Sequence, residues 1–188
     1  VLFVGGAGVG KSAFLQNITY KWAKGGEHGL FNNKFDYVFK VKLKLLFSDW
    51  KAGYTIDDLD EPLKCFILYS LKSEPAYANL DSEHRIKKDE IFNVINTSNQ
   101  DKILLLLDGY DEVASYISSG KDPIVTRMSE EIFKLKHVLM TSRPNALNSQ
   151  MENKFDRKIE TAGLGAEDIQ IYVDKYFSKQ QELLEERI

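Results

Sequence analysis

The sequence predicts an α/β layered fold with a mostly parallel sheet. Short apolar runs typical of buried strands alternate along the chain with segments of helical periodicity. A glycine-rich loop joins the first apolar run to the first helical segment, as expected where a strand passes into a helix of a layered fold. With 188 residues, of which 43% are hydrophobic and 28% charged, the chain has the size and composition of one ordinary globular domain.

The N-terminal part of the chain predicts a strand, a helix and a second strand. Residues 1–4 form a continuous apolar run, as a strand buried on both faces requires. Residues 11–24 carry apolar side chains three and four positions apart, which is the spacing of an amphipathic helix. Residues 35–46 alternate polar and apolar side chains, so we expect a half-exposed strand. Several of its polar positions are lysines, which favours an edge of the sheet.

The middle of the chain predicts helices followed by the most apolar strand. Residues 57–72 have a helical pattern, with Pro62 either in the first turn or splitting the segment. Residues 73–82 are loop-like, and residues 83–95 are a second helical candidate. Residues 103–107 are wholly apolar and predict a buried strand.

The C-terminal part continues the alternation of helices and strands. Residues 122–134 have a helical pattern, and residues 137–140 predict another short apolar strand. A fifth, weaker strand is expected around Ile159. Residues 169–177 then form an amphipathic helical pattern.

Composition excludes several classes of protein. The single cysteine, Cys65, rules out an internal disulfide and Cys-rich zinc sites, and it fits a reducing compartment such as the cytoplasm. The longest aliphatic run, residues 103–107, is too short to span a bilayer, which takes about 20 residues. The 25 basic and 28 acidic residues give a net charge of −3, which argues against nucleic-acid binding. Because the chain starts at Val1 directly on a strand-like run, we expect it to be part of a longer protein.

A phosphate-binding loop is predicted between the first strand and the first helix. The run fits the pattern Gly, four residues, Gly-Lys-Ser. Glycines let the backbone wrap around a phosphate and point several N–H groups at it, while the following helix presents its positive end to the same anion. The lysine supplies a charge for the β- and γ-phosphates, and the serine hydroxyl can ligate Mg²⁺. The residues of this loop are Gly5, Gly6, Ala7, Gly8, Val9, Gly10, Lys11 and Ser12.

Acidic side chains follow the apolar strand at residues 103–107. Asp108 stands at the C-terminal end of that strand, where it can hold the Mg²⁺ shell directly or through water. Asp111 and Glu112 follow, and either of them can orient or deprotonate a water molecule beside the γ-phosphate. The sequence does not choose between the two, and each also suits a helix cap or a solvated turn.

Three sequence blocks together resemble the NACHT family, which comprises signalling NTPases of the STAND class that are related to the AAA+ ATPases. The first block is the phosphate loop at residues 5–12, the second is residues 104–112, and the third is Leu-Met-Thr-Ser-Arg-Pro at residues 139–144. The Asp-Gly-aromatic-Asp-Glu part of the second block is the most specific, since a phosphate loop alone indicates only a superfamily. The resemblance covers nearly the whole chain.

This resemblance implies a P-loop NTPase fold. It is a three-layer α/β/α arrangement with a five-stranded, mostly parallel sheet in the order 5-1-4-3-2, followed by the start of a helical subdomain. It implies a NACHT nucleotide-binding domain over residues 1–162 and the helical subdomain over residues 163–188. The order places the strand before Arg143 between the phosphate-loop strand and the Asp108 strand, so that the functional strand ends converge on one nucleotide.

The family also implies a role for each candidate residue. Lys11 and Ser12 would bind the phosphates and Mg²⁺, and Asp108 would be the acid of the metal site. Asp111 and Glu112 would be the catalytic acidic pair, one of them positioning water. Arg143 would sense the γ-phosphate, which suits a guanidinium at a strand end, although a surface arginine paired with an acid is the alternative.

The function implied is a nucleotide-dependent switch with ATP, ADP and Mg²⁺ as ligands. The ADP-bound form would be inactive, and the ATP-bound form would self-associate; slow Mg²⁺-dependent hydrolysis would reset the switch. Such a domain would belong to a larger NOD-like or defence signalling protein with flanking sensor and effector regions. Two alternatives stay open: a conventional phosphate-loop ATPase or kinase, and a scaffold that binds nucleotide for stability without hydrolysing it.

Overall fold

Five parallel strands form the sheet. The computed structural model describes residues 1–25, 31, 34–55, 57–81, 83, 85–95, 97–163 and 165–185. Every strand pairing in the sheet is parallel. From one edge to the other the strands are β2 (Tyr37–Lys42), β3 (Ile103–Asp108), β4 (Val138–Ser142), β1 (Leu2–Gly5) and β5 (Lys158–Thr161). Read from the opposite edge, this is the predicted order 5-1-4-3-2, which the structure confirms.

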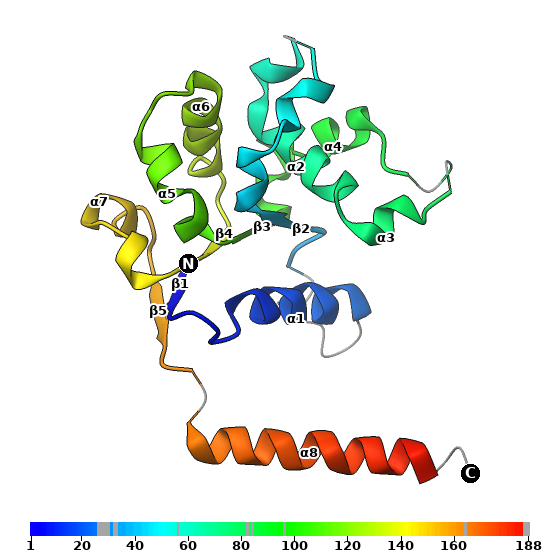
Figure 1. Cartoon of the computed structure of the whole chain (residues 1–188). Helices are drawn as coiled ribbons and strands as arrows, with labels where there is room; N and C mark the ends of the chain where they lie inside the picture. Colours follow the sequence, from blue (N-terminus) through cyan, green and yellow to red (C-terminus); the bar gives the residue numbers. More distant parts are fainter. Residues whose placement is uncertain are drawn as a thin grey trace.

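Helices cover both faces of the sheet, and β3 contributes side chains to the hydrophobic core on each face. Helix α1 (Lys11–Lys24) lies on one face, and α2 (Pro62–Lys72), α5 (Tyr110–Ser118) and α6 (Pro123–Ile132) lie on the other (Figure 1). Alternate leucines of β3 belong to separate core clusters, one on the side of α1 and one on the side of α2, α5 and α6. This two-sided burial explains why the strand is apolar from Ile103 to Leu107. The three-layer α/β/α prediction is confirmed.

The predicted strand at residues 35–46 is too long. Strand β2 ends at Lys42, which lies opposite Asp108, the last residue of β3. Beyond that point the neighbouring strand no longer offers backbone groups, so Leu43–Phe47 form a 3-10 helix instead. Leu43 and Leu46 are both buried, at the three-residue spacing of that helix. The prediction that this strand lies at a sheet edge is confirmed.

The segment between β2 and β3 is helical and broken into short pieces. Pro62 splits the predicted helix at residues 57–72, because α2 begins at this proline after a 3-10 turn at Asp58–Asp60. A 3-10 turn also covers Trp50–Gly53, and Thr97–Lys102 form another before β3. The loop-like segment at residues 73–82 contains the short helix α3 (Pro75–Ala78), and the helical candidate at residues 83–95 narrows to α4 (Lys88–Val94).

Helix α5 (Tyr110–Ser118), which begins directly after β3, was not predicted from the sequence. Gly109 precedes it in a left-handed conformation, with φ of +81°. Tyr110 and Val113 are buried on the inner side of α5, three positions apart. The short acidic turn predicted after Asp108 is therefore the first turn of a helix, and Asp111 and Glu112 occupy it.

After β4 the chain forms further short elements and one long helix. A 3-10 turn covers Pro144–Ala146, and α7 (Ser149–Glu152) precedes β5, the predicted weak strand. Helix α8 (Ala166–Glu185) lies apart from the sheet in Figure 1, and it includes the predicted helix at residues 169–177. In the described part of the chain, no helix combines the length and apolar character that crossing a membrane requires.

Asp122 ties three elements together at the start of α6. Its carboxylate caps the helix by accepting the N–H groups of Ile124 and Val125 at 2.9 and 3.3 Å. It also pairs with Lys51 and accepts the hydroxyl of Tyr116 at 3.1 Å. Burial alone would raise the pKa of this carboxyl, but these hydrogen bonds outweigh burial and lower its pKa below the ordinary value.

Asp122→Ala is expected to lower the free energy of unfolding by about 1 kcal/mol at neutral pH, because it removes the cap. Asp122→Asn keeps an acceptor for the cap but loses the charge, so it isolates the ionic part. Because the folded pKa is lowered, that part is present above the unfolded pKa of about 3.9 and is lost as the pH falls through the folded value. Chemical denaturation at several pH values measures it. If the difference in unfolding free energy between the parent chain and Asp122→Asn stays constant down to a pH of about 2, the charge of Asp122 does not stabilise the fold.

Candidate functional site

The loop between β1 and α1 has the geometry of an anion-binding turn. Gly10 stands before the helix with φ of +88°, a left-handed conformation that favours glycine. No side chain caps the N-terminus of α1. The first-turn N–H groups and the positive end of the helix dipole therefore face the loop, which is the arrangement that binds phosphate.

A pocket of about 320 Å³ lies at the C-terminal ends of β1, β3 and β4. It brings together most of the residues that the sequence singled out, although they come from separate parts of the chain. Gly5 and Gly6 stand just outside its lining. The residues that line it are Ala7, Gly8, Val9, Gly10, Lys11, Ser12, Ala13, Asp108, Gly109, Asp111, Glu112 and Arg143.

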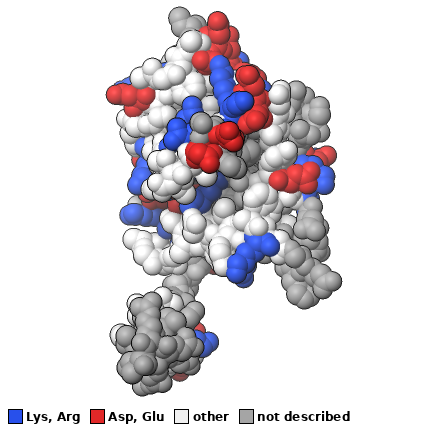
Figure 2. Space-filling view, turned by 90° about the vertical axis from the view of Figure 1, so that its right-hand side faces the viewer, with Lys and Arg blue, Asp and Glu red and all other residues white. Residues whose placement is uncertain are grey.

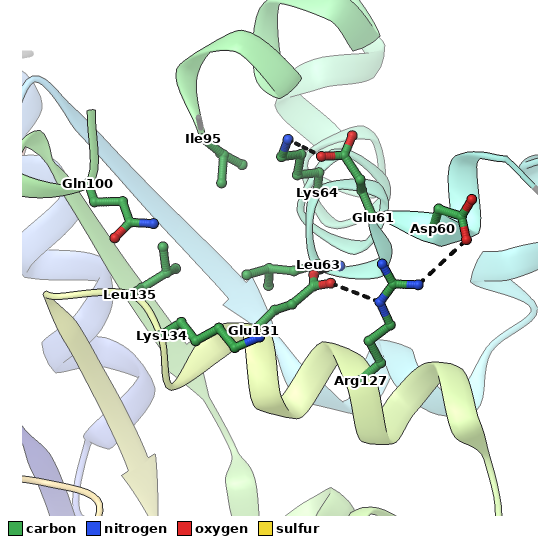
Figure 3. Close-up of a pocket in the computed structure, with 10 residues that line it drawn as sticks. All are labelled: Asp60, Glu61, Leu63, Lys64, Ile95, Gln100, Arg127, Glu131, Lys134 and Leu135. Atoms are coloured by element: carbon green, nitrogen blue, oxygen red, sulfur yellow. Dashed lines mark hydrogen bonds and ion pairs between the residues drawn. The ribbon is translucent and has the colours of Figure 1, made fainter. Parts of the chain in front are cut away.

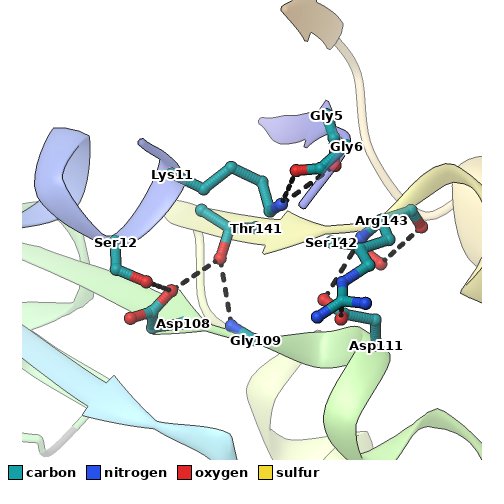
Figure 4. Close-up of polar contacts among 10 residues, drawn as sticks. All are labelled: Gly5, Gly6, Lys11, Ser12, Asp108, Gly109, Asp111, Thr141, Ser142 and Arg143. Carbon is teal, nitrogen blue, oxygen red and sulfur yellow. Dashed lines mark hydrogen bonds and ion pairs between the residues drawn. The ribbon is translucent and has the colours of Figure 1, made fainter. Parts of the chain in front are cut away.

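Lys11 lies across the phosphate loop. Its ammonium donates hydrogen bonds to the carbonyl oxygens of Gly5 at 2.9 Å and Gly6 at 2.8 Å (Figure 4). These contacts hold the amino group at the mouth of the loop. A phosphate bound there would meet a positive charge already in place.

Ser12 and Asp108 link the phosphate loop to the end of β3. The Ser12 hydroxyl donates to Asp108 Oδ1 at 3.0 Å. Because the serine gives its only proton to the carboxylate, its oxygen lone pairs stay available to a cation. A hydroxyl beside a carboxylate suits Mg²⁺, which takes its other ligands from phosphate and water. Among the residues that the structure describes, His, Cys, Asp and Glu do not gather in groups of three or more that could hold a metal by themselves.

Arg143 and Asp111 form an ion pair across the pocket. Arg143 Nε lies 2.9 Å from Asp111 Oδ2, and the backbone N–H of Arg143 donates to Asp111 Oδ1 at 3.2 Å. The Asp111 side chain is 12% exposed and that of Arg143 is 50% exposed, so the acid is fixed and the guanidinium reaches into solvent. Pairing through Nε is compatible with a second anion at the outer end of the same planar group.

Glu112 is placed differently from Asp111, although the two are adjacent in α5. A Cβ atom at Gly109 would lie 3.1 Å from Glu112 Oε1, so this carboxylate sits over the turn that starts the helix. Glu112 lines the pocket, and its position in the first turn of α5 is favourable for a negative charge.

Thr141 is a site residue that the sequence analysis missed. It follows the predicted strand at residues 137–140, and in the structure β4 includes it and continues to Ser142. Its side chain is fully buried, and its hydroxyl lies 3.0 Å from both Asp108 Oδ1 and the Gly109 nitrogen. A hydroxyl-bearing residue at the end of an apolar strand was the available signal, because a buried hydroxyl must find a partner.

Comparison with known proteins identifies the family of this chain. A model of the NACHT domain matches residues 1–180. The chain belongs to the NACHT family. This NACHT domain is a nucleotide-binding domain of the P-loop class. Its phosphate loop, its strand order and the pocket at the strand ends are those expected of that class.

The curated relatives are much longer than this NACHT domain. The human MHC class II transactivator is 27% identical over 191 residues, which cover 94% of this chain and 15% of that protein. The mouse protein NLRC3 is 24% identical over 202 residues, with coverages of 97% and 16%. The domain therefore spans only a small part of the length of these proteins.

Two solved structures align with most of this chain. The FIGL-1 AAA domain in complex with ADP aligns with a TM-score of 0.49 and 13% identity, over 93% of this chain and 46% of that one. The structure of Drosophila ORC bound to DNA aligns with a TM-score of 0.45 and 15% identity, over 100% and 44%.

A second pocket of the NACHT domain, of about 300 Å³, lies away from the strand ends, between α2 and α6 (Figure 3). Arg127 points toward Asp60 at 3.5 Å and toward Glu131 at 3.4 Å. Glu131 also accepts the backbone N–H of Leu63 at 3.2 Å. Ion pairs of Arg127 link α6 to the 3-10 turn before α2, and the Leu63–Glu131 hydrogen bond links α6 to α2, so the acidic and basic side chains of this pocket largely neutralise one another.

Surface charge on the side of α3 is mixed. On this face, Lys and Arg side chains are interspersed with Asp and Glu (Figure 2). Nucleic-acid-binding surfaces instead gather positive charge on one face or stripe. The pattern agrees with the net charge of −3.

Proposed function

We propose that this NACHT domain is a nucleotide-dependent switch that binds ADP or ATP with Mg²⁺ and hydrolyses ATP slowly. The observation that carries the proposal is one pocket that joins the phosphate loop to Asp108, Glu112 and Arg143. These are the groups that phosphate binding, a metal shell, water activation and charge sensing each need.

The geometry supports one role for each group in the pocket. The loop N–H groups and Lys11 would bind the phosphates. Ser12 and Asp108 would hold Mg²⁺, whose charge offsets that of the phosphates. Arg143 would reach the γ-phosphate, the group that distinguishes ATP from ADP.

The contacts of the acidic pair favour separate roles for its two members. Asp111 is engaged by Arg143 through both carboxylate oxygens, so we assign it to orienting the sensor. Glu112 lies over Gly109 at the pocket, so we assign it to positioning the attacking water. Of the two acids that the sequence left open, we therefore propose Glu112 as the one that positions and activates the water.

The wider role of the domain rests on its family. We propose that residues 1–162 form the nucleotide-binding unit and that residues 163–188 begin a helical subdomain that responds to the bound nucleotide. Ile169, Tyr172 and Tyr176 of α8 are at least half exposed, as expected of a helix that packs against further structure. Self-association in the ATP state, a cytoplasmic location and a place in an NLR-type signalling protein complete the proposal.

Single- and multiple-turnover hydrolysis of Mg-ATP tests the proposed function. We expect slow turnover in the parent chain and a loss of about 100-fold or more in Glu112→Gln, with ATP binding retained, because the water loses its base. Asp111→Asn is the matched control, since it removes an adjacent charge and should keep more of the turnover. Fast steady cycling or transfer to an acceptor would instead indicate a motor or kinase. Bound nucleotide without any turnover would indicate a scaffold.

A further inference from the structure

Thr141 connects the ends of β3 and β4 at the proposed Mg²⁺ site. The strand register pairs Leu107 with Met140, so Thr141 lies beside Asp108 one position beyond the last pair. Its hydroxyl is 3.0 Å from Asp108 Oδ1 and 3.4 Å from the carbonyl oxygen of Leu107. The N–H of Gly109 donates to the same hydroxyl at 3.0 Å.

The hydroxyl has one proton to give and lone pairs to accept with. Because Gly109 N–H can only donate, the threonine oxygen accepts there and uses its own proton elsewhere. The carboxylate at 3.0 Å is the closer and the charged acceptor, so the proton goes to Asp108. Thr141 is fully buried, and no water is needed to complete this set of bonds.

Asp108 Oδ1 therefore receives two hydroxyl donors, from Ser12 and from Thr141. This fixes the rotation of the carboxylate and keeps Oδ2 for a cation or its water shell. The Gly109 N–H is held by the same threonine, which anchors the left-handed turn from which α5 starts. One side chain thus positions the metal-site acid and the start of the helix that carries Glu112.

We propose that Thr141 is a positioning residue for the Mg²⁺ site. It acts through Asp108 and Gly109 and does not touch the nucleotide. The inference rests on the proposed function, because it assigns the support of the metal site that the function uses. Partners behind a metal ligand of this kind typically contribute 10–100-fold to metal affinity.

The test is Mg²⁺ titration of the chain with adenylyl imidodiphosphate bound, together with the affinity of that nucleotide in EDTA. Thr141→Val keeps the shape of the side chain and removes the hydroxyl; Thr141→Ser keeps the hydroxyl. We expect Thr141→Val to weaken the apparent Mg²⁺ affinity by about 10-fold or more and to leave the EDTA affinity within about twofold. Thr141→Ser should restore the Mg²⁺ affinity.

Thr19→Val is the matched control, because it removes a part-buried hydroxyl that donates to the carbonyl of Leu15 within α1. If Thr141→Val fails to fold, Thr141→Cys takes its place, since a thiol fills the site but is a weak donor and acceptor. Equal Mg²⁺ affinity in the parent and the folded variant overturns the inference, as does a parent that binds the nucleotide without any Mg²⁺ dependence. Failure of the parent to bind nucleotide at all would instead refute the proposed function.

Discussion

Lys11→Ala is expected to weaken the binding of Mg-ATP by about 100-fold, or about 2.7 kcal/mol. The ammonium already lies at the phosphate loop, held by two carbonyl oxygens, and supplies charge-assisted hydrogen bonds to the phosphates. Titration calorimetry with ATP and with ADP measures the loss. The folded state should keep its stability, because the contacts removed are local to the loop.

Lys21→Ala is the control for this experiment. Lys21 is an exposed lysine in the last turn of the same helix, so its removal changes the net charge equally. It should leave the affinity unchanged. Equal losses in the two variants would mean that the effect is one of overall charge, and an unchanged affinity in Lys11→Ala would place the nucleotide elsewhere.

Gly5→Ala is expected to destabilise the domain by about 1–3 kcal/mol through overpacking. A Cβ at Gly5 would lie 2.5 Å from Thr161 Cγ2, 2.7 Å from Val9 Cγ2 and 3.3 Å from the backbone oxygen of Thr161. Because one of these atoms belongs to the backbone of β5, the strand or the phosphate loop must move. Thermal or chemical denaturation measures the loss, and nucleotide affinity should fall with it.

Gly6→Ala tests the same idea in the neighbouring residue. Its Cβ would meet only Val9 Cγ1, at an ordinary contact distance of 3.8 Å. We expect the unfolding free energy of Gly6→Ala to lie close to that of the parent. If the two variants unfold alike, crowding between β1 and β5 is not the reason for the glycine.

The fold was predictable where the sequence pattern had a single structural explanation. Strand β3 is apolar from Ile103 to Leu107 because both of its faces are covered, and such a continuous apolar run predicts a buried strand. The predicted strand at residues 35–46 extended too far, because polar and apolar side chains continue to alternate beyond Lys42. Lys42 lies opposite Asp108, the last residue of β3 that can pair with this strand. Sequence pattern does not reveal where a neighbouring strand ends.

The local motifs of the candidate site were predictable, but its contacts and the part of Thr141 in them were not. The phosphate loop and the acids after β3 are local motifs, so a single sequence indicates them. The pairing of Asp111 with Arg143, and the contact of Thr141 with Asp108, join residues 32 and 33 positions apart. These contacts depend on β3 and β4 being neighbours and on the start of α5, which no local pattern specified.

We propose that Arg143, oriented by Asp111, senses the γ-phosphate. The most direct test is the ratio of the affinities for adenylyl imidodiphosphate and ADP, measured with Mg²⁺ in the parent chain and in Arg143→Ala. We predict that the ratio falls by about tenfold in Arg143→Ala, about 1.4 kcal/mol, while the ADP affinity is unchanged. Asp111→Asn should give a smaller change in the same direction. Equal weakening of both nucleotides in Arg143→Ala, or no change in either, would show that Arg143 does not sense the γ-phosphate.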